Sequence, residues 1–337
     1  MKISRTTTEH AVALLGALIL GAGLSACGKA SAGQAGVVSP ERSADANSVT
    51  ATWGPLVVRE GEVDGQADRT PWSGSWLPLR STYLFQSDDG SAPLQKYDQY
   101  MQEIHDKDSH AADFEKNNTN LYDPNALGWE GRCDAWATAS IIEPEPTKPV
   151  TIGDITFTVG DLKALLTETY ENTDTLTQFG QNFVPGLDFS EMYPDQFQRA
   201  VQHELVDHHR PMIFDNDPTE QVWNTPMYAA QFVMTGDSND STVMHVTAYI
   251  SGVSPFVPGP DYVGSLTVDY IYTYDLYGTR QPDGSFLVVY GEWTGDSKIA
   301  HPNFVSVLSG RHDHSSINTE ISTDVVNEIL AKDRAQH

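Results

Sequence analysis

Residues 128–137 read Gly-Trp-Glu-Gly-Arg-Cys-Asp-Ala-Trp-Ala and contain one of the two cysteines of the 337-residue chain. The run from Cys133 to Ile142 is short and rich in alanine, which predicts a buried helix that begins at the cysteine. Glu-Pro-Glu-Pro at residues 143–146 predicts its end. Because the helix dipole and the free N–H groups favour a thiolate, this position predicts a reactive cysteine, whereas the alternative is a buried structural one.

The other cysteine, Cys27, closes Leu-Ser-Ala-Cys at residues 24–27, behind Lys2, Arg5 and an apolar stretch. This pattern resembles a bacterial lipobox and predicts a lipoprotein signal peptide over residues 1–26 with lipidation of Cys27. We therefore expect an exported protein that is lipid-anchored to a bacterial membrane or cell surface. The alternative is an ordinary secretory signal with an incidental cysteine. In either case Cys133 remains as a free thiol without a disulfide partner.

Composition divides the rest of the chain. Residues 27–70 are rich in Ala, Gly, Ser and Asp, and predict a disordered tether. Residues 71–315 hold most aromatic side chains and predict one large domain or two closely packed lobes, with residues 316–337 as a C-terminal tail or helix. The formal charge of −26 argues against nucleic-acid binding, which needs clustered basic residues.

The pattern of apolar residues predicts an α+β fold, with a helical first half followed by an antiparallel β-sheet second half. Further predicted helices cover residues 162–170 and 195–206. The predicted strands are residues 155–159, 212–214, 227–234, 243–250, 265–276 and 285–290, with Pro-Asp-Gly at 282–284 as a hairpin turn.

A thiol nucleophile needs a base, usually histidine, and a carboxylate that orients it. His245 opens a predicted β-branched strand and is our first candidate, and His301 is the competitor. Three acidic residues on or near later strands are candidates for the carboxylate, and the sequence does not choose among them: Asp269, Asp275 and Glu292.

Two further motifs resemble metal sites without meeting their requirements. His203 and His208 are separated by five positions and so do not share one helix face as a zinc-binding pair must. Asp-Asn-Asp at residues 215–217 lacks the glycine and the distant glutamate of a calcium loop. We predict no metal site and no cofactor, and the sequence leaves calcium dependence open.

Several blocks together resemble the transglutaminase elicitor family. They are residues 131–137, 143–146 and 161–168, Val-Trp-Asn-Thr-Pro at 222–226, Gly-Glu-Trp at 291–293, and His-Pro-Asn-Phe at 301–304, where Asn303 replaces the usual Asp. The likeness runs in order through roughly residues 75 to 305, which makes it more specific than any single motif.

The resemblance implies a papain-like cysteine catalytic core with Cys133 as nucleophile, and the order of later blocks supports His245 as base. Two departures from papain stand out. Asp134 separates the cysteine from Trp136, and no glutamine stands six residues before Cys133, so the oxyanion donor is unassigned.

The activity implied by the resemblance is that of a protein-glutamine γ-glutamyltransferase, which joins protein glutamine to lysine or another amine through a cysteine thioester, with deamidation of the glutamine if water reacts instead. Its partners would be proteins with accessible glutamine and lysine. Trp129, Trp136 and Trp223 are candidates to shield the thioester from water, and core packing is the alternative for each. The alternative functions are a papain-like cysteine peptidase and a catalytically inactive surface-binding lipoprotein.

Overall fold

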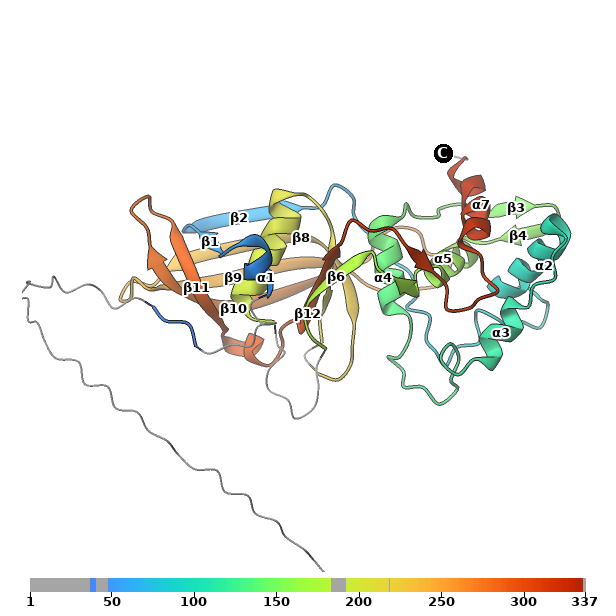
Figure 1. Ribbon diagram of the computed structural model, residues 1–337, viewed down its shortest axis with the longest axis horizontal. Coiled ribbons are helices and arrows are strands. Elements are labelled where there is room, and N and C mark those ends of the chain that lie inside the picture. Colours follow the sequence, from blue (N-terminus) through green and yellow to red (C-terminus); the bar gives the residue numbers. More distant parts are fainter. Residues whose placement is uncertain (1–36, 41–47, 183–191, 218, 336–337) are drawn as a thin grey trace, which may run out of the picture. The chain divides into compact units, whose positions relative to one another are not determined.

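The computed structural model describes residues 37–40, 48–182, 192–217 and 219–335 (Figure 1). The predicted signal peptide and Cys27 lie outside these residues, as does much of the predicted tether. Within the described ranges, no helix combines the length and the apolar character needed to cross a membrane.

A large antiparallel sheet forms most of the second half of the chain, in the order β1-β11-β10-β9-β8-β7-β12-β6, with β2 also paired to β8. Its strands are β1 (Val57–Val58), β2 (Gly61–Gln66), β6 (Leu176–Gly180), β7 (Met212–Asp215), β8 (Asn224–Gly236), β9 (Val243–Val253), β10 (Thr267–Arg280), β11 (Phe286–Trp293) and β12 (Phe304–Leu308). Buried and more exposed residues alternate along β9 and β10, as expected for strands with one face toward a core.

One face of this sheet packs around its own apolar core. Helix α1 (Ser48–Trp53) contacts α6 (Pro194–Val201), which continues into a π-helix, η2 (Gln202–Asp207). Phe197 and Leu205 from these two segments are buried in one cluster with Phe232 of β8. A short 3-10 helix, η3 (Gly295–Lys298), contacts β10.

A second core belongs to the helical region. It contains α2 (Pro93–His105), α3 (Ala111–Asn117), α4 (Cys133–Ile142), α5 (Val159–Glu168) and α7 (Thr323–Arg334), with the two-stranded pairs β3 (Val150–Ile152) with β4 (Ile155–Phe157) and β5 (Asn172–Thr173) with β13 (His314–Ser315). Trp136 is fully buried in this core beside Leu162 and Ile329. The C-terminal helix α7 is therefore part of the packed domain and packs on α5 and β3.

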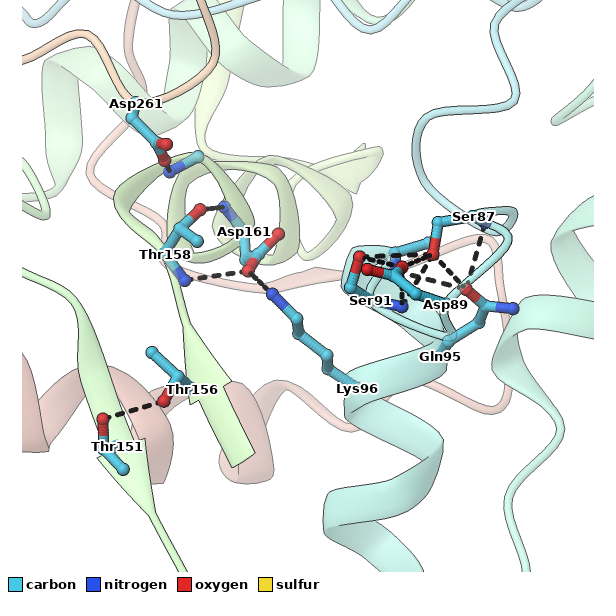
Figure 2. A network of polar contacts seen from close by, with 12 residues as sticks. Ser87, Asp89, Ser91, Gln95, Lys96, Thr151, Thr156, Thr158, Asp161 and Asp261 are labelled. Carbon is cyan, nitrogen blue, oxygen red and sulfur yellow. Dashed lines mark hydrogen bonds and ion pairs between the residues drawn. The ribbon is translucent and has the colours of Figure 1, made fainter. Parts of the chain in front are cut away.

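Polar contacts fix the start of α5. The Thr158 hydroxyl accepts a hydrogen bond from the Asp161 backbone N–H, and the Asp161 carboxylate accepts one from the Thr158 N–H. Lys96 of α2 lies 2.6 Å from the same carboxylate, and Asp261 accepts a hydrogen bond from the Gly160 N–H (Figure 2). This reciprocal capping explains why the helix begins here.

The structure confirms the predicted helix that begins at Cys133 and the mixed fold of helices and antiparallel strands. The predicted tether is wrong at residues 48–70, which form α1, β1 and β2. Val58 and Leu56 are buried, and β2 pairs with β8 over six residues. The low apolar content of this segment hid these contacts, because pairing to an existing strand needs few large side chains.

Candidate active site

Cys133 is the first residue of α4 and is 5% exposed. Its thiol donates a hydrogen bond to the carbonyl oxygen of Val222 at 3.5 Å. The sulfur accepts a hydrogen bond from the side-chain amide of Asn224, also at 3.5 Å. Asn224 is the first residue of β8, and α4 packs directly on this strand. The site thus joins a helix start to a strand start, where free backbone N–H groups are available.

The backbone before the cysteine is held by a close approach that requires glycine. Gly131 forms an isolated antiparallel β-bridge with Pro78. The Arg132 N–H donates a hydrogen bond to the Trp76 carbonyl oxygen at 2.6 Å. A Cβ atom at Gly131 would lie 2.6 Å from Trp76 Cδ1, closer than atoms can come. Gly131 therefore permits the approach that positions Cys133.

A cavity of about 450 Å³ opens beside Cys133. Trp129, Asp134 and Thr138 contribute from the α4 side, Tyr170 from the turn after α5, and Phe304 from β12. The described residues that line this cavity include no histidine. The base that serves this thiol therefore has to be sought among other side chains.

Asp215 is the titratable residue that stands out. It is fully buried at the end of β7, in register with Asn224 of β8. Its carboxylate accepts hydrogen bonds from the Trp223 N–H at 2.9 Å and from the Asn303 amide at 3.3 Å. Burial nevertheless raises the pKa of Asp215 to about 6, so this carboxyl group changes its charge near neutral pH.

The pKa of the Cys133 thiol is shifted upward, which is opposite to the shift that favours a nucleophile. Burial, followed by the negative charge of Asp134, raises the pKa of Cys133 to about 11, and the charge of Asp215 adds to this. The amide of Asn224 partly offsets the shift by donating to sulfur. A thiol that is protonated at neutral pH needs a base, and the Asp215 carboxylate is close enough to affect its charge.

A buried ionic cluster lies immediately behind the cysteine. Arg132 is 5% exposed and pairs with Glu115 and Glu171, and its Nε lies 3.3 Å from the fully buried Glu168. Its guanidinium also donates to the Leu121 carbonyl oxygen at 3.1 Å. Burial raises the pKa of both Glu115 and Glu168, and the negative charge of Glu171 adds to the shift because three carboxyl groups share one cation. This cluster anchors the residue that precedes Cys133.

The structure contradicts the prediction that His245 faces Cys133. His245 pairs with Thr235, eleven residues beyond Asn224 along β8, a span of about 36 Å in an extended strand. Its side chain is 48% exposed, with Nδ1 2.7 Å from Asp275 and Nε2 3.0 Å from Asp237. The reason is topological: β9 runs antiparallel to β8, so the residue that opens β9 lies at the far end of β8 from Cys133.

The other predicted partners also lie apart from the thiol. Asp275 is bound to His245, Glu292 is paired with Asp275 in register, and Asp269 accepts a hydrogen bond from Ser251 at 2.7 Å. His301 is buried and stacks on the Trp293 ring, 5.1 Å between ring centroids. Two residues later in the chain, however, Asn303 reaches Asp215.

The three predicted tryptophans have different surroundings. Trp129 lines the cavity beside Cys133. Trp136 is fully buried in the helical core, so its place is that of a core aromatic. Trp223 is half-buried and packs edge-on against Trp76, with ring centroids 5.8 Å apart.

Asp215, Asn224 and Asn303 were not among the predicted site residues. Asp215 ends a short apolar run and begins the Asp-Asn-Asp motif, which we compared only with a calcium loop. Asn224 and Asn303 fall within blocks of the family resemblance. Nothing in those blocks alone shows that the two side chains lie at the same site.

No group of three or more His, Cys, Asp and Glu side chains among the described residues is arranged to hold a metal ion. In the segment that resembles a zinc helix, Glu204 is buried and binds Arg210 and His203. The buried carboxylate of this π-helix, Glu204, therefore forms an ion pair with Arg210 instead of a metal site.

Comparison with known proteins identifies one matching family and one similar solved structure. Residues 103–258 match the transglutaminase elicitor family, which confirms the predicted resemblance. The crystal structure of the GP42 transglutaminase from Phytophthora sojae is similar, with a TM-score of 0.67 and 18% identity over 87% of this chain and 98% of that chain. At this identity the likeness shows the fold alone. No curated protein sequence matches this chain significantly.

Proposed function

We propose that this chain, a transglutaminase-like protein with a transglutaminase elicitor region at residues 103–258, is a protein-glutamine γ-glutamyltransferase. The observation that carries the proposal is the arrangement at Cys133, where a thiol opens a helix beside an accessible cavity. The Asn224 amide contacts the sulfur, and Asp215, which ionises near neutral pH, is next to Asn224 in strand register.

In the first step the Cys133 sulfur attacks the carboxamide carbon of a substrate glutamine. The thiol proton passes to the Asp215 carboxylate as the carbon–sulfur bond forms. The carbon–nitrogen bond then breaks, and the nitrogen leaves as ammonia after it takes the proton from Asp215. The product on the protein is a thioester.

In the second step a lysine amine attacks the thioester carbon. Asp215 accepts the proton of the amine, and the Cys133 sulfur leaves and is protonated again. The result is an isopeptide bond between two proteins. If water attacks in place of the amine, the product is a glutamate at the original glutamine position.

Both steps develop negative charge on the carbonyl oxygen. We assign its stabilisation to the Cys133 backbone N–H at the start of α4 and to the Asn224 side-chain amide, which lies 3.5 Å from the sulfur. Preorganised donors of this kind typically contribute a factor of about 10² to 10³ in rate. The Asn224 amide would then serve the role for which the sequence offered no glutamine.

A second candidate function is a surface-binding protein that does not catalyse acyl transfer. Two observations favour it: the pKa of Cys133 is raised to about 11, and the described lining of its cavity has no histidine. In both cases we propose, from the leader alone, that the protein is exported and anchored through Cys27.

The test compares the wild type with Cys133→Ala in an assay for incorporation of monodansylcadaverine into a glutamine-rich protein, with ammonia release measured in parallel. The transferase predicts incorporation and ammonia release that both disappear in the variant. Cleavage of the substrate with new amino termini would instead indicate a peptidase. Binding of the same protein with neither reaction would favour the second candidate.

A further inference from the structure

A second cavity, of about 300 Å³, lies outside the mechanism described above. One wall comes from residues 75–84, including Trp76, Tyr83 and Leu84, and the other from residues 255–260, including Val257 and Gly259. All the described residues that line this cavity are uncharged. In a chain with a formal charge of −26, an uncharged cavity is a distinct local environment.

This cavity is connected to the cysteine through backbone contacts. Trp76 lines the cavity, and its carbonyl oxygen accepts a hydrogen bond from the Arg132 N–H at 2.6 Å. Pro78, also in the lining, bridges to Gly131, which itself lines the cavity beside Cys133. The two cavities therefore lie next to the same short backbone contact.

Aromatic side chains provide a second connection. The rings of Trp76, Trp223 and Phe256 contact one another, with centroid separations of 5.1 to 5.8 Å. Trp223 precedes Asn224, whose amide contacts the Cys133 sulfur. Phe256 is 58% exposed, so this three-ring cluster extends from the thiol site to the surface beside the second cavity.

The wall formed by residues 255–260 is held in place from behind. Asp261 accepts a hydrogen bond from the Gly160 N–H at the start of α5, as Figure 2 shows. A Cβ atom at Gly160 would lie 2.7 Å from Pro260 Cβ, so the loop lies tightly against this helix. A cavity with such a supported wall is preformed, which lowers the entropic cost of binding.

We propose that this cavity binds an apolar side chain, aliphatic or aromatic, that neighbours the reactive glutamine in the protein substrate. The inference rests on the proposed function, since it uses Cys133 as the reacting centre. An uncharged lining offers no carboxylate to a lysine ammonium, which favours an apolar occupant. The volume of about 300 Å³ lies at the lower end of the range for ligand pockets and suits one side chain.

Gly259 lies in the lining of this cavity and is the position that we choose for a larger side chain. A Cβ atom at this position meets no atom within 4 Å, so a larger side chain can be accommodated without a backbone clash. We choose Gly259→Phe as the blocking variant and Gly259→Ala as its matched partner. Ile271→Phe, on the exposed part of β10, controls for the addition of an aromatic ring elsewhere.

The experiment measures kcat/KM for ammonia release from glutamine peptides that carry Phe, Leu or Ala at each neighbouring position, with the full chain. We expect the wild type, Gly259→Ala and Ile271→Phe to prefer Phe or Leu by about 10- to 100-fold at one position. Gly259→Phe should reduce this preference to about 1. A wild type without preference, or a preference that Gly259→Phe leaves intact, would overturn the proposal, as would selectivity found only among acceptor amines.

Binding separates this proposal from the proposed function. Calorimetry of the same peptides with Cys133→Ala needs no reaction, and should give about 10-fold tighter Kd for the preferred peptide than for its Ala counterpart. This difference should vanish in Cys133→Ala combined with Gly259→Phe. If no peptide reacts but this binding difference is found, the transferase activity fails and the cavity assignment stands. Equal Kd values would refute the cavity assignment.

Discussion

The two ends of β8 carry two contrasting clusters of polar side chains. At its start, Asn224 contacts the Cys133 sulfur and pairs in register with Asp215 of β7, and Cys133 and Asp215 are buried. Near its end, His245 lies between Asp275 and Asp237 in an exposed position. The exposed cluster has the side chains expected of a base and its orienting acid, but only the buried one includes the thiol.

This contrast shows what a histidine–carboxylate pair does and does not indicate. At an exposed position the carboxylate changes the pKa of the histidine, but the pair contributes little to stability. At the buried end, burial raises the pKa of a single carboxyl group to about 6, and the charge of Asp217 adds to this shift. Function is therefore better inferred from burial and position in the sheet than from the identity of the residue pair.

The largest effect on activity should follow from Asp215→Asn, which removes the proposed base at the buried end. We expect kcat for ammonia release to fall by about 10² to 10⁴-fold. In the wild type the rate should rise as pH increases through about 6, because the ionised carboxylate is the active form. Asp269→Asn, an acid on β10 that binds Ser251, is the matched control and should retain activity. A fully active Asp215→Asn protein would remove Asp215 from the mechanism.

Arg132→Met tests the ionic cluster behind the cysteine. Removal of its cation leaves Glu115, Glu168 and Glu171 without their partner, and we expect a loss of about 3 to 5 kcal/mol in the free energy of unfolding at pH 8. Because burial raises the pKa of Glu115 and Glu168, they stabilise the fold when protonated and lose this contribution as pH rises through their folded-state values.

The loss in Arg132→Met should therefore be smaller at pH 5 than at pH 8, as measured by denaturant unfolding at both values. Arg132→Lys keeps the charge and should lose less stability. A loss independent of pH would show that the three glutamates are not the cause.

A neighbouring pair at the edge of the sheet allows burial and exposure to be compared directly. Leu56 is 3% exposed and Val57 is 46% exposed, although they are adjacent in sequence. We expect Leu56→Ala to lower the free energy of unfolding by about 2 to 5 kcal/mol, and Val57→Ala by about 0.5 kcal/mol or less. Equal effects in urea unfolding would restore the view that residues 48–70 are a tether.

The smallest effect should come from His245→Ala at the exposed end. Activity should stay within two-fold of the wild type. Its two carboxylate partners raise the pKa of His245, so its stabilisation is present at low pH and is lost as pH rises through the raised value. We expect a loss of less than about 1 kcal/mol at pH 5 and none at pH 9, measured by thermal unfolding. A large loss of activity would return His245 to the mechanism.

Much of the fold could be predicted from local pattern. The helix from Cys133 to Ile142 is confirmed at both ends, because alanine content, the cysteine and the following prolines all point to it. Alternation predicted the long strands β8 to β11 with ends shifted by several residues. Segments whose structure depends on pairing with distant residues, such as β2 and β12, were not predicted.

The candidate site was predicted only at its nucleophile. Cys133 is identifiable because its own neighbours define its environment. Asp215 lies beside Asn224, which contacts the thiol, only through the register of β7 and β8, which no local pattern encodes. His245 was selected because it opens a strand, but the direction of that strand decides which end of the sheet it reaches.

Rapid-quench mass spectrometry of the full chain, mixed with a glutamine peptide in the absence of amine, tests whether Cys133 forms a thioester with Asp215 as its base. We predict a peptide adduct on Cys133, lighter by one ammonia than the sum of both masses, in the wild type and in His245→Ala. Asp215→Asn should form it at least 100 times more slowly. An adduct that forms normally in Asp215→Asn and is lost in His245→Ala would exclude Asp215 as the base and return His245 to that role.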